Sequence, residues 1–127
     1  MRTYQLLIEL VTPVRLRVGQ LGMFDFPPGR YIYTGSARRN IAARVARHLS
    51  RDKRLRWHID YLLADPSARV VAVRYAKIGE CELNLSTRGA VVAARFGASD
   101  CRAGCKSHLK YAGPLRHSAA RGGARSR

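Results

Sequence analysis

Short segments of alternating apolar and polar residues, separated by proline and glycine, make up the first 35 positions of the chain. Residues 3–11 are expected to form a β-strand, because their apolar side chains recur with a period of two. The apolar face of this strand consists of Tyr4, Leu6, Ile8 and Leu10. Pro13 is expected to end the strand, since proline cannot donate to a sheet.

Further strands are expected in four places. The segments 14–18, 24–26, 31–33 and 70–75 alternate in hydropathy or are rich in β-branched and aromatic residues. Turns at residues 19–22 and 27–29 separate the early strands, and Gly35 is expected to stop the segment 31–33.

Three helices are expected between and after these strands. The first would run from about residue 38 to 49, with Ser36 as its N-cap and an apolar stripe of Ile41, Val45 and Leu49. The second would cover residues 56–63, and the third residues 80–95, although Gly89 weakens its middle. Together these elements predict an α+β fold, with a small mostly antiparallel sheet flanked by helices.

The length of 127 residues fits one domain. We expect this domain to span residues 1–112, followed by a disordered basic tail at 113–127 with four arginines and no acid. No apolar run approaches the roughly 20 residues that cross a bilayer, so no membrane partner is expected. Glu9 interrupts the early apolar run, which therefore resembles a strand more than a signal peptide. With three cysteines and no export signal, a cytoplasmic location with reduced thiols is expected.

The charge of the chain indicates its class of partner. Lysine and arginine number 24 against 8 acidic residues, which gives a formal net charge of +16. Such an excess favours nucleic acid, because each neutralised phosphate releases condensed counterions. The alternative is a protein with a solvated basic face.

The basic residues concentrate in the segment 38–56, which holds eight of them against Asp52 alone. We predict nucleic-acid contacts from Arg38, Arg39, Arg47, Arg51 and Lys53, together with Lys106. The alternative, especially for Arg47 and Arg51, is that they only face solvent. Arg44 differs because it adjoins the apolar stripe, where packing could aim its guanidinium at one oxyanion.

One pattern in this region resembles a known family. The residues Tyr33-Thr34-Gly35 are followed by Arg44 after eleven positions and by His48 after four more, an arrangement similar to the second half of a GIY-YIG nuclease core. Tyr4, within Arg2-Thr3-Tyr4, would match the tyrosine of the first half. The segments WHIDYLL, GECEL, GASDC and CKSHL resemble a small stand-alone branch of this superfamily that is sometimes fused to DNA-repair enzymes. The resemblance covers residues 3–111.

The resemblance implies a DNA endonuclease, a hydrolase that cleaves phosphodiester bonds with Mg²⁺ or Mn²⁺. Tyr4 would help to activate water, and Tyr33 would bind the attacking water or the scissile phosphate. Arg44 would stabilise charge on the phosphorus centre, and His48 would handle protons or contact phosphate. Glu80 would hold the metal, with Glu82 as the second choice.

The chain also departs from the family pattern. The first motif lacks its glycine, and the 29 positions between Tyr4 and Tyr33 require an extra hairpin. Asn84 lies too close to Glu80 to match the family's asparagine. A phenol with an ordinary pKa of about 10 would also need nearby cations to act as a base. The alternative function is a catalytically inactive module that binds DNA or RNA, with the two tyrosines as core aromatics.

A second group of residues could bind metal. Cys101, Cys105 and His108, with Cys81 upstream, offer the donor set of a structural zinc site. One alternative is a set of buried free thiols with a hydrogen-bonded His108. Another is that Asp100, Lys106, Ser107 and His108 extend the phosphate-binding surface. Because neighbouring side chains on a helix diverge by about 100°, Glu80 and Cys81 are not expected to serve one centre.

The segment after the basic helix holds two further polar residues. His58 is a secondary candidate for the site, while Trp57 and Ile59 are expected to pack in the core. Asp60 is two positions from His58, so the pair would point to different sides of a helix. Capping, or a salt bridge to Arg54 or Arg56, is the structural alternative.

Overall fold

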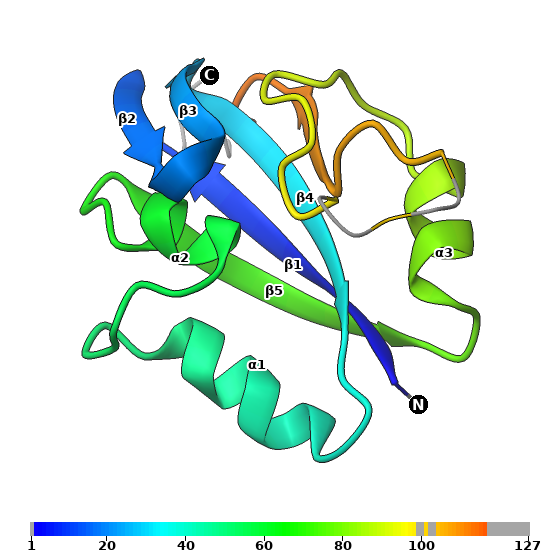
Figure 1. Ribbon diagram of the computed structural model, residues 1–127. Coiled ribbons are helices and arrows are strands. Elements are labelled where there is room, and N and C mark those ends of the chain that lie inside the picture. The colour runs from blue at the N-terminus through cyan, green and yellow to red at the C-terminus, as the bar shows by residue number, and fades with distance from the viewer. Residues whose placement is uncertain (1, 99–100, 102–103, 117–127) are drawn as a thin grey trace.

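The computed structural model describes residues 2–98, 101 and 104–116. They form an α+β fold with a four-stranded sheet in the order β5-β1-β4-β6, a two-stranded sheet β2-β3, and helices packed around them (Figure 1). The strands are β1 Thr3–Leu10, β2 Val14–Val18, β3 Gly22–Phe26, β4 Gly29–Ser36, β5 Ala68–Ala76 and β6 Leu109–Gly113. The helices are the 3₁₀ turn η1 Gly19–Leu21 and the α-helices α1 Ile41–Leu49, α2 His58–Leu63 and α3 Glu80–Ser86. The predicted fold class is confirmed.

The central strand β1 has the predicted apolar face. Tyr4, Leu6, Ile8 and Leu10 are each at most 1% exposed. β1 pairs antiparallel with β4 on one side and with β5 on the other. The core that covers this face includes Val45 of α1 and Ile59, Leu62 and Leu63 of α2.

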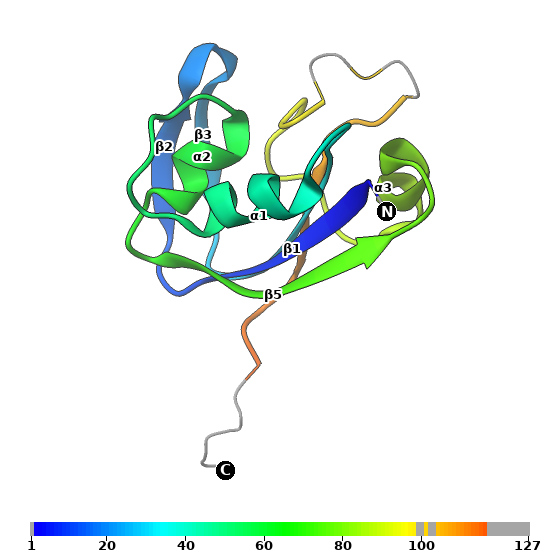
Figure 2. The same cartoon turned by 90° about the horizontal axis from the view of Figure 1, so that it is seen from below.

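Both α1 and α2 lie over one face of the sheet, and α3 lies at the far end from the β2-β3 hairpin (Figures 1 and 2). The hairpin is the extra one that the spacing of Tyr4 and Tyr33 requires. Within the described part of the chain, no helix combines the length and apolar character needed to span a bilayer.

The start of α1 differs from the prediction. β4 continues through Gly35 to Ser36, so Ser36 is a strand residue and not an N-cap. The cap is Asn40, whose side-chain oxygen accepts a hydrogen bond from the Ala43 amide. Leu49, predicted in the apolar stripe, is 52% exposed because the helix ends there.

The prediction of a helix over residues 80–95 is also wrong. α3 ends at Ser86, where the Thr87 hydroxyl donates back to the Leu83 carbonyl and the backbone becomes extended. Gly89 then adopts φ +149°, and Ala90 bridges to Tyr111. The strand β6 was not expected from the sequence, and it joins the sheet by pairing antiparallel with β4. Residues 117–127 of the predicted tail lie outside the described residues.

Candidate functional site

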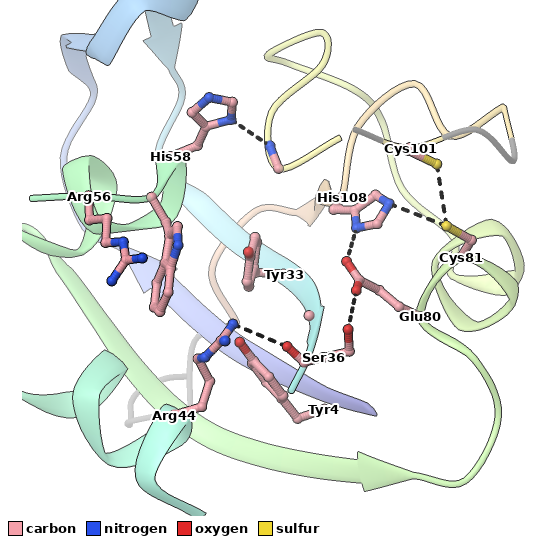
Figure 3. Close-up of a pocket in the computed structure, with 13 residues that line it drawn as sticks. Tyr4, Tyr33, Ser36, Arg44, Arg56, His58, Glu80, Cys81, Cys101 and His108 are labelled. Atoms are coloured by element: carbon pink, nitrogen blue, oxygen red, sulfur yellow. Dashed lines mark hydrogen bonds and ion pairs between the residues drawn. The ribbon is translucent and has the colours of Figure 1, made fainter. Parts of the chain in front are cut away.

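A cavity of about 440 Å³ brings together most of the site residues that the family resemblance implied. Its polar lining includes Tyr4, Tyr33, Arg44, Glu80 and His108. In Figure 3 the two tyrosines lie between Arg44 on one side and Glu80 on the other. These side chains come from β1, β4, α1 and α3, so the fold assembles the site from distant parts of the sequence.

The two phenols can reach the cavity because Gly35 has no side chain. Gly35 lies opposite Tyr4 in the β1-β4 register. A Cβ atom at this position would lie 2.6 Å from the Tyr4 hydroxyl oxygen and 3.2 Å from Cε2 of Tyr33. The glycine of the Tyr-Thr-Gly segment is therefore required for the close approach of the rings and does not end the strand.

His48 is the hydrogen-bond partner of the Tyr4 hydroxyl. The Tyr4 hydroxyl oxygen and His48 Nε2 share a hydrogen bond of 2.6 Å. His48 is 2% exposed. Its burial, with the nearby Lys53 cation, lowers its pKa to about 4, so the ring is neutral at pH 7. His48 does not line the cavity, but it contacts three residues that do: the Tyr4 hydroxyl by the hydrogen bond, and the rings of Tyr33 and Trp57 at centroid distances of 6.0 and 5.7 Å.

The phenols are protonated at neutral pH. Burial raises the pKa of Tyr4 to about 12, although the Arg44 guanidinium acts in the opposite direction. Burial also raises the pKa of Tyr33, and the neighbouring Tyr4 adds to this effect. Desolvation therefore outweighs the effect of the nearby Arg44 cation, which a phenol would need in order to act as a base.

Arg44 is held rigidly at the cavity wall. Its Nη1 donates to the Ser36 carbonyl oxygen at 3.2 Å. Its Cζ lies 4.3 Å from the centroid of the Trp57 ring, within the range of a cation–π contact. Arg47 and Arg56 also lie over this ring, at 4.2 and 5.4 Å. Trp57 packs against the core, as expected, but it is only partly buried and also lines the cavity.

Glu80, the first residue of α3, is fixed on both of its oxygens. Ser36 Oγ donates to Oε1 at 2.5 Å, and His108 Nδ1 lies 2.6 Å from Oε2. Burial opposes ionisation of Glu80, but contacts with His108 and Ser36 outweigh it, so its pKa lies below the ordinary value. Glu82, the second metal candidate, is exposed and does not line the cavity.

The residues Cys81, Cys101, Cys105 and His108 form a cluster that could hold a metal ion. Their ligand atoms all lie within 4.8 Å of one another. Cys81 Sγ lies 3.3 Å from Cys101 Sγ and 4.0 Å from His108 Nε2. A tetrahedral zinc site with bonds of about 2.0–2.3 Å spaces its ligand atoms by roughly 3.5–3.8 Å, so the donor set fits such an ion.

Glu80 does not belong to the cysteine cluster that contains Cys81, but it contacts His108, which does belong to that cluster. The side chains diverge from neighbouring positions of α3, as expected. However, His108 lies between them, with Nδ1 at Glu80 and Nε2 toward Cys81. The two candidate centres therefore meet at one imidazole, which the sequence did not indicate.

Several of the basic side chains that were predicted to contact nucleic acid form hydrogen bonds within the protein. Arg47 donates to both carboxylate oxygens of Asp60, each at 2.9 Å. Arg51 donates to the backbone carbonyls of Leu63, Asp65 and Ala68, and Lys53 to those of Arg47 and His48. Arg47 and Arg51 thus bind the protein and do not only face solvent. Arg38, Arg39 and Lys106 are exposed, and their contacts with nucleic acid stay predictions.

The remaining polar candidates have structural partners. Asp60, which is 0% exposed, also accepts from the amides of Arg56 and Trp57 and so caps α2. His58 lines the cavity, and its Nδ1 accepts from the Gly97 amide at 2.8 Å. Asn84 is buried and donates to the Ser107 carbonyl, away from the cavity.

A second, basic cavity of about 600 Å³ adjoins the first one. It shares Ser36 and Glu80 with the first cavity and carries three cationic side chains, Arg2, Arg38 and Lys77. A path lined by positive charge therefore leads from Glu80 toward the start of β1 and the end of β5.

Comparison with known proteins gives one match. A family model described as a domain of unknown function, DUF123, matches residues 3–122. No curated protein and no solved structure matches the chain.

Proposed function

The chain belongs to the DUF123 family of domains of unknown function, and we propose that it is a metal-dependent endonuclease of the GIY-YIG type that cleaves phosphodiester bonds in DNA. One observation carries this proposal: Tyr4, Tyr33, Arg44 and Glu80 line the same cavity. Phosphoryl transfer needs a positioned cation and an oriented nucleophile more than covalent chemistry. The cavity offers a positioned cation, Arg44, and two phenols that could orient a water molecule.

Arg44 is the group that would bind the phosphate whose bond is cleaved. Its contacts with Ser36 and Trp57 hold the guanidinium before any substrate arrives. A preorganised cation stabilises developing charge without reorganising during the reaction. Tyr33, protonated at neutral pH, would donate a hydrogen bond to the same phosphate or to the attacking water.

Tyr4 and His48 would together remove a proton from water. The phenol is too basic in its buried site to be ionised beforehand. The neutral His48 can instead accept the phenol proton at Nε2 while the Tyr4 oxygen takes one from water. His48 is then a positioning and proton-accepting group behind Tyr4, and it does not contact the phosphate.

Glu80 would hold the divalent metal, Mg²⁺ or Mn²⁺. One carboxylate with water molecules suits a hard cation. When bound, the metal would polarise the phosphate and neutralise its charge. Among the described residues each oxygen of Glu80 has one partner, so lone pairs remain for this role, since a carboxylate has about four acceptor sites.

The bound DNA strand would continue from the first cavity into the second. Arg2, Arg38 and Lys77 line the second cavity and carry no acid-paired charge among the described contacts. Flanking phosphates could thus be neutralised on the far side of Ser36 and Glu80. The formal charge of +16 supports this part of the proposal.

We further propose that the cluster of Cys81, Cys101, Cys105 and His108 holds a structural Zn²⁺ ion. Three thiols and an imidazole are soft donors, which suit zinc better than magnesium. Zinc binding would release the proton of the Cys81 thiol. Without the metal, burial and the neighbouring thiols raise the pKa of Cys81 to about 12, so this thiol is protonated at neutral pH. The site needs reduced thiols, in keeping with the cytoplasmic location that we propose.

A cleavage assay tests the proposed activity. Duplex, branched and single-stranded DNA would be incubated with the protein and Mg²⁺ or Mn²⁺. Arg44→Ala should lower cleavage at least 100-fold and leave most of the binding, because the exposed arginines remain. Arg39→Ala is the matched control, since Arg39 is an exposed arginine outside the cavity. No metal-dependent cleavage of any substrate would refute the endonuclease.

The alternative is a module that binds nucleic acid without cleaving it. The raised pKa of both phenols and the occupied oxygens of Glu80 favour it. In that case Arg44→Ala and Arg39→Ala would weaken binding to similar extents, and metal ions would have no effect.

A further inference from the structure

His108 contacts a different group with each of its ring nitrogens. Nδ1 lies 2.6 Å from Oε2 of Glu80, whereas Nε2 lies 4.0 Å from Cys81 Sγ. The residue is 2% exposed, so water does not compete for either nitrogen. Figure 3 shows the imidazole between the cysteines and the carboxylate.

This arrangement resembles the support of a metal-binding histidine by a carboxylate. A histidine that binds metal through one nitrogen carries its proton on the other, and a carboxylate commonly accepts that N–H. Such a partner fixes the tautomer and the orientation of the ring. Here Nε2 belongs to the cysteine cluster, and Glu80 lies at the opposite nitrogen.

We propose that Glu80 serves both metal centres: it orients His108 for the zinc ion, and the zinc-bound His108 in turn positions Glu80 in the cavity. This inference rests on the proposed zinc site and on the proposed role of Glu80. In this proposal His108 is a positioning residue, since it acts through its contact with Glu80.

The contacts continue from Glu80 to the phosphate-binding group. The Oε1 atom of Glu80 accepts from the Ser36 hydroxyl, and the Ser36 carbonyl accepts from Arg44. Loss of zinc would release His108 from the cysteines. It would thereby weaken the contact of His108 with Glu80, on which the contacts through Ser36 to Arg44 depend. The zinc centre therefore supports the geometry of the cavity and not only the fold of the segment that carries Cys105.

The zinc affinity of the full chain tests the first half of the proposal. A chromophoric chelator would compete for Zn²⁺ with the wild type, Glu80→Gln and Glu82→Gln. We expect one zinc per chain and an affinity 10- to 100-fold lower for Glu80→Gln, the usual effect of losing such a carboxylate. Glu82→Gln is the matched control, because Glu82 is an exposed acid on the same helix. Equal affinities, or no zinc binding by the wild type, would overturn the proposal.

His108→Cys tests the second half. Four cysteines can still hold zinc, but this variant lacks the nitrogen that contacts Glu80. We expect the variant to retain one zinc and to bind Mn²⁺ in the cavity at least 10-fold more weakly, measured by electron paramagnetic resonance of free Mn²⁺. Wild-type Mn²⁺ affinity in the zinc-loaded variant would overturn the positioning role. Should the variant lose zinc, the Mn²⁺ affinity of the wild type with and without bound zinc decides, and equal affinities would overturn the positioning role.

These measurements separate this inference from the proposed function. Zinc affinity and Mn²⁺ affinity do not depend on cleavage. If the protein cleaves no DNA but Glu80→Gln still lowers the zinc affinity, the inference that Glu80 supports the zinc site stands and only the proposed nuclease activity is refuted. If the protein cleaves DNA but the wild type, Glu80→Gln and Glu82→Gln bind zinc with equal affinity, the proposed nuclease activity stands and the inference that Glu80 supports the zinc site is refuted.

Discussion

The Tyr4 hydroxyl oxygen lies 2.6 Å from His48 Nε2, and these two buried side chains come from β1 and α1, 44 positions apart in the chain. Tyr4 is 1% and His48 2% exposed. The contact joins the central strand β1 to the basic helix α1 next to the cavity, which Tyr4 lines and His48 does not. It also places a neutral acceptor behind the phenol, which the proposed proton transfer needs.

The first prediction concerns the pH dependence of stability. The folded-state pKa of His48 is lowered from 6.5 to about 4, so between these values the unfolded chain binds a proton that the folded chain does not. The free energy of unfolding should therefore fall by up to about 3 kcal/mol as pH decreases through this window. Urea titrations at pH 7 and pH 4.5 measure the difference. His48→Gln, which cannot titrate, should lose this part of the pH dependence, and an unchanged profile would contradict the buried, neutral ring.

The second prediction concerns the glycine between the phenols. Gly35→Ala would place a Cβ atom 2.6 Å from the Tyr4 hydroxyl oxygen, so the ring must move. We expect a loss of about 1–3 kcal/mol in stability, as for overpacked cores, and loss of cleavage. Gly79→Ala is the control, because a Cβ there meets no atom within 4 Å. Full activity in Gly35→Ala would show that the position of Tyr4 is not important.

The third prediction contrasts two ion pairs. Arg47→Ala would leave the fully buried Asp60 carboxylate without its cation, and removal of one partner from a buried pair costs about 3–5 kcal/mol. The Arg15–Asp25 pair is 3.9 Å long with both side chains more than two-thirds exposed, so Arg15→Ala should cost less than about 1 kcal/mol. Chemical denaturation of both variants measures the contrast. Similar losses would show that Arg47 contributes only as a surface charge.

Much of the strand structure could be predicted from local patterns. The period of two in β1 identified its buried face, and the alternation of β2 gave its bounds as observed, Val14–Val18. The resemblance of the segment from Tyr33 to His48 to a known nuclease pattern selected Tyr33 and Arg44, two residues that line one cavity. In each case the signal lies within one short segment of the chain.

The features that the sequence did not reveal depend on distant partners. β6 is a short strand without alternation, and it exists because β4 offers an edge. Helical composition continues beyond α3, yet Thr87 and Gly89 end the helix and Ala90 pairs with Tyr111. His108 and Glu80 are in contact although they lie 28 positions apart in the chain, and no periodic pattern in the sequence predicts such a contact.

The fourth prediction uses Trp57, the single tryptophan of the chain. Its ring lines the cavity and contacts Arg44, so its fluorescence should change when DNA binds. Titration of an oligonucleotide in the absence of divalent metal measures this change without cleavage. In Arg44→Ala the emission of the free protein should already differ, because the cation over the ring is gone. Identical emission of free and bound wild type would indicate that DNA binds elsewhere.

The last prediction concerns the basic segment beyond the described residues. Arg121, Arg125 and Arg127 lie in it, and a chain that ends at Arg116 lacks these three charges. If they contact phosphates, the slope of log affinity against log salt concentration should become less steep by up to about 2.7 in duplex DNA, since each phosphate contact contributes about 0.9. Fluorescence anisotropy at several salt concentrations gives the slope. Arg44→Ala removes one cavity charge and should change the slope by no more than about 1. Cleavage per bound complex should persist in the shortened chain, because every residue that lines the cavity remains; an unchanged slope would exclude a contribution of the segment to phosphate binding.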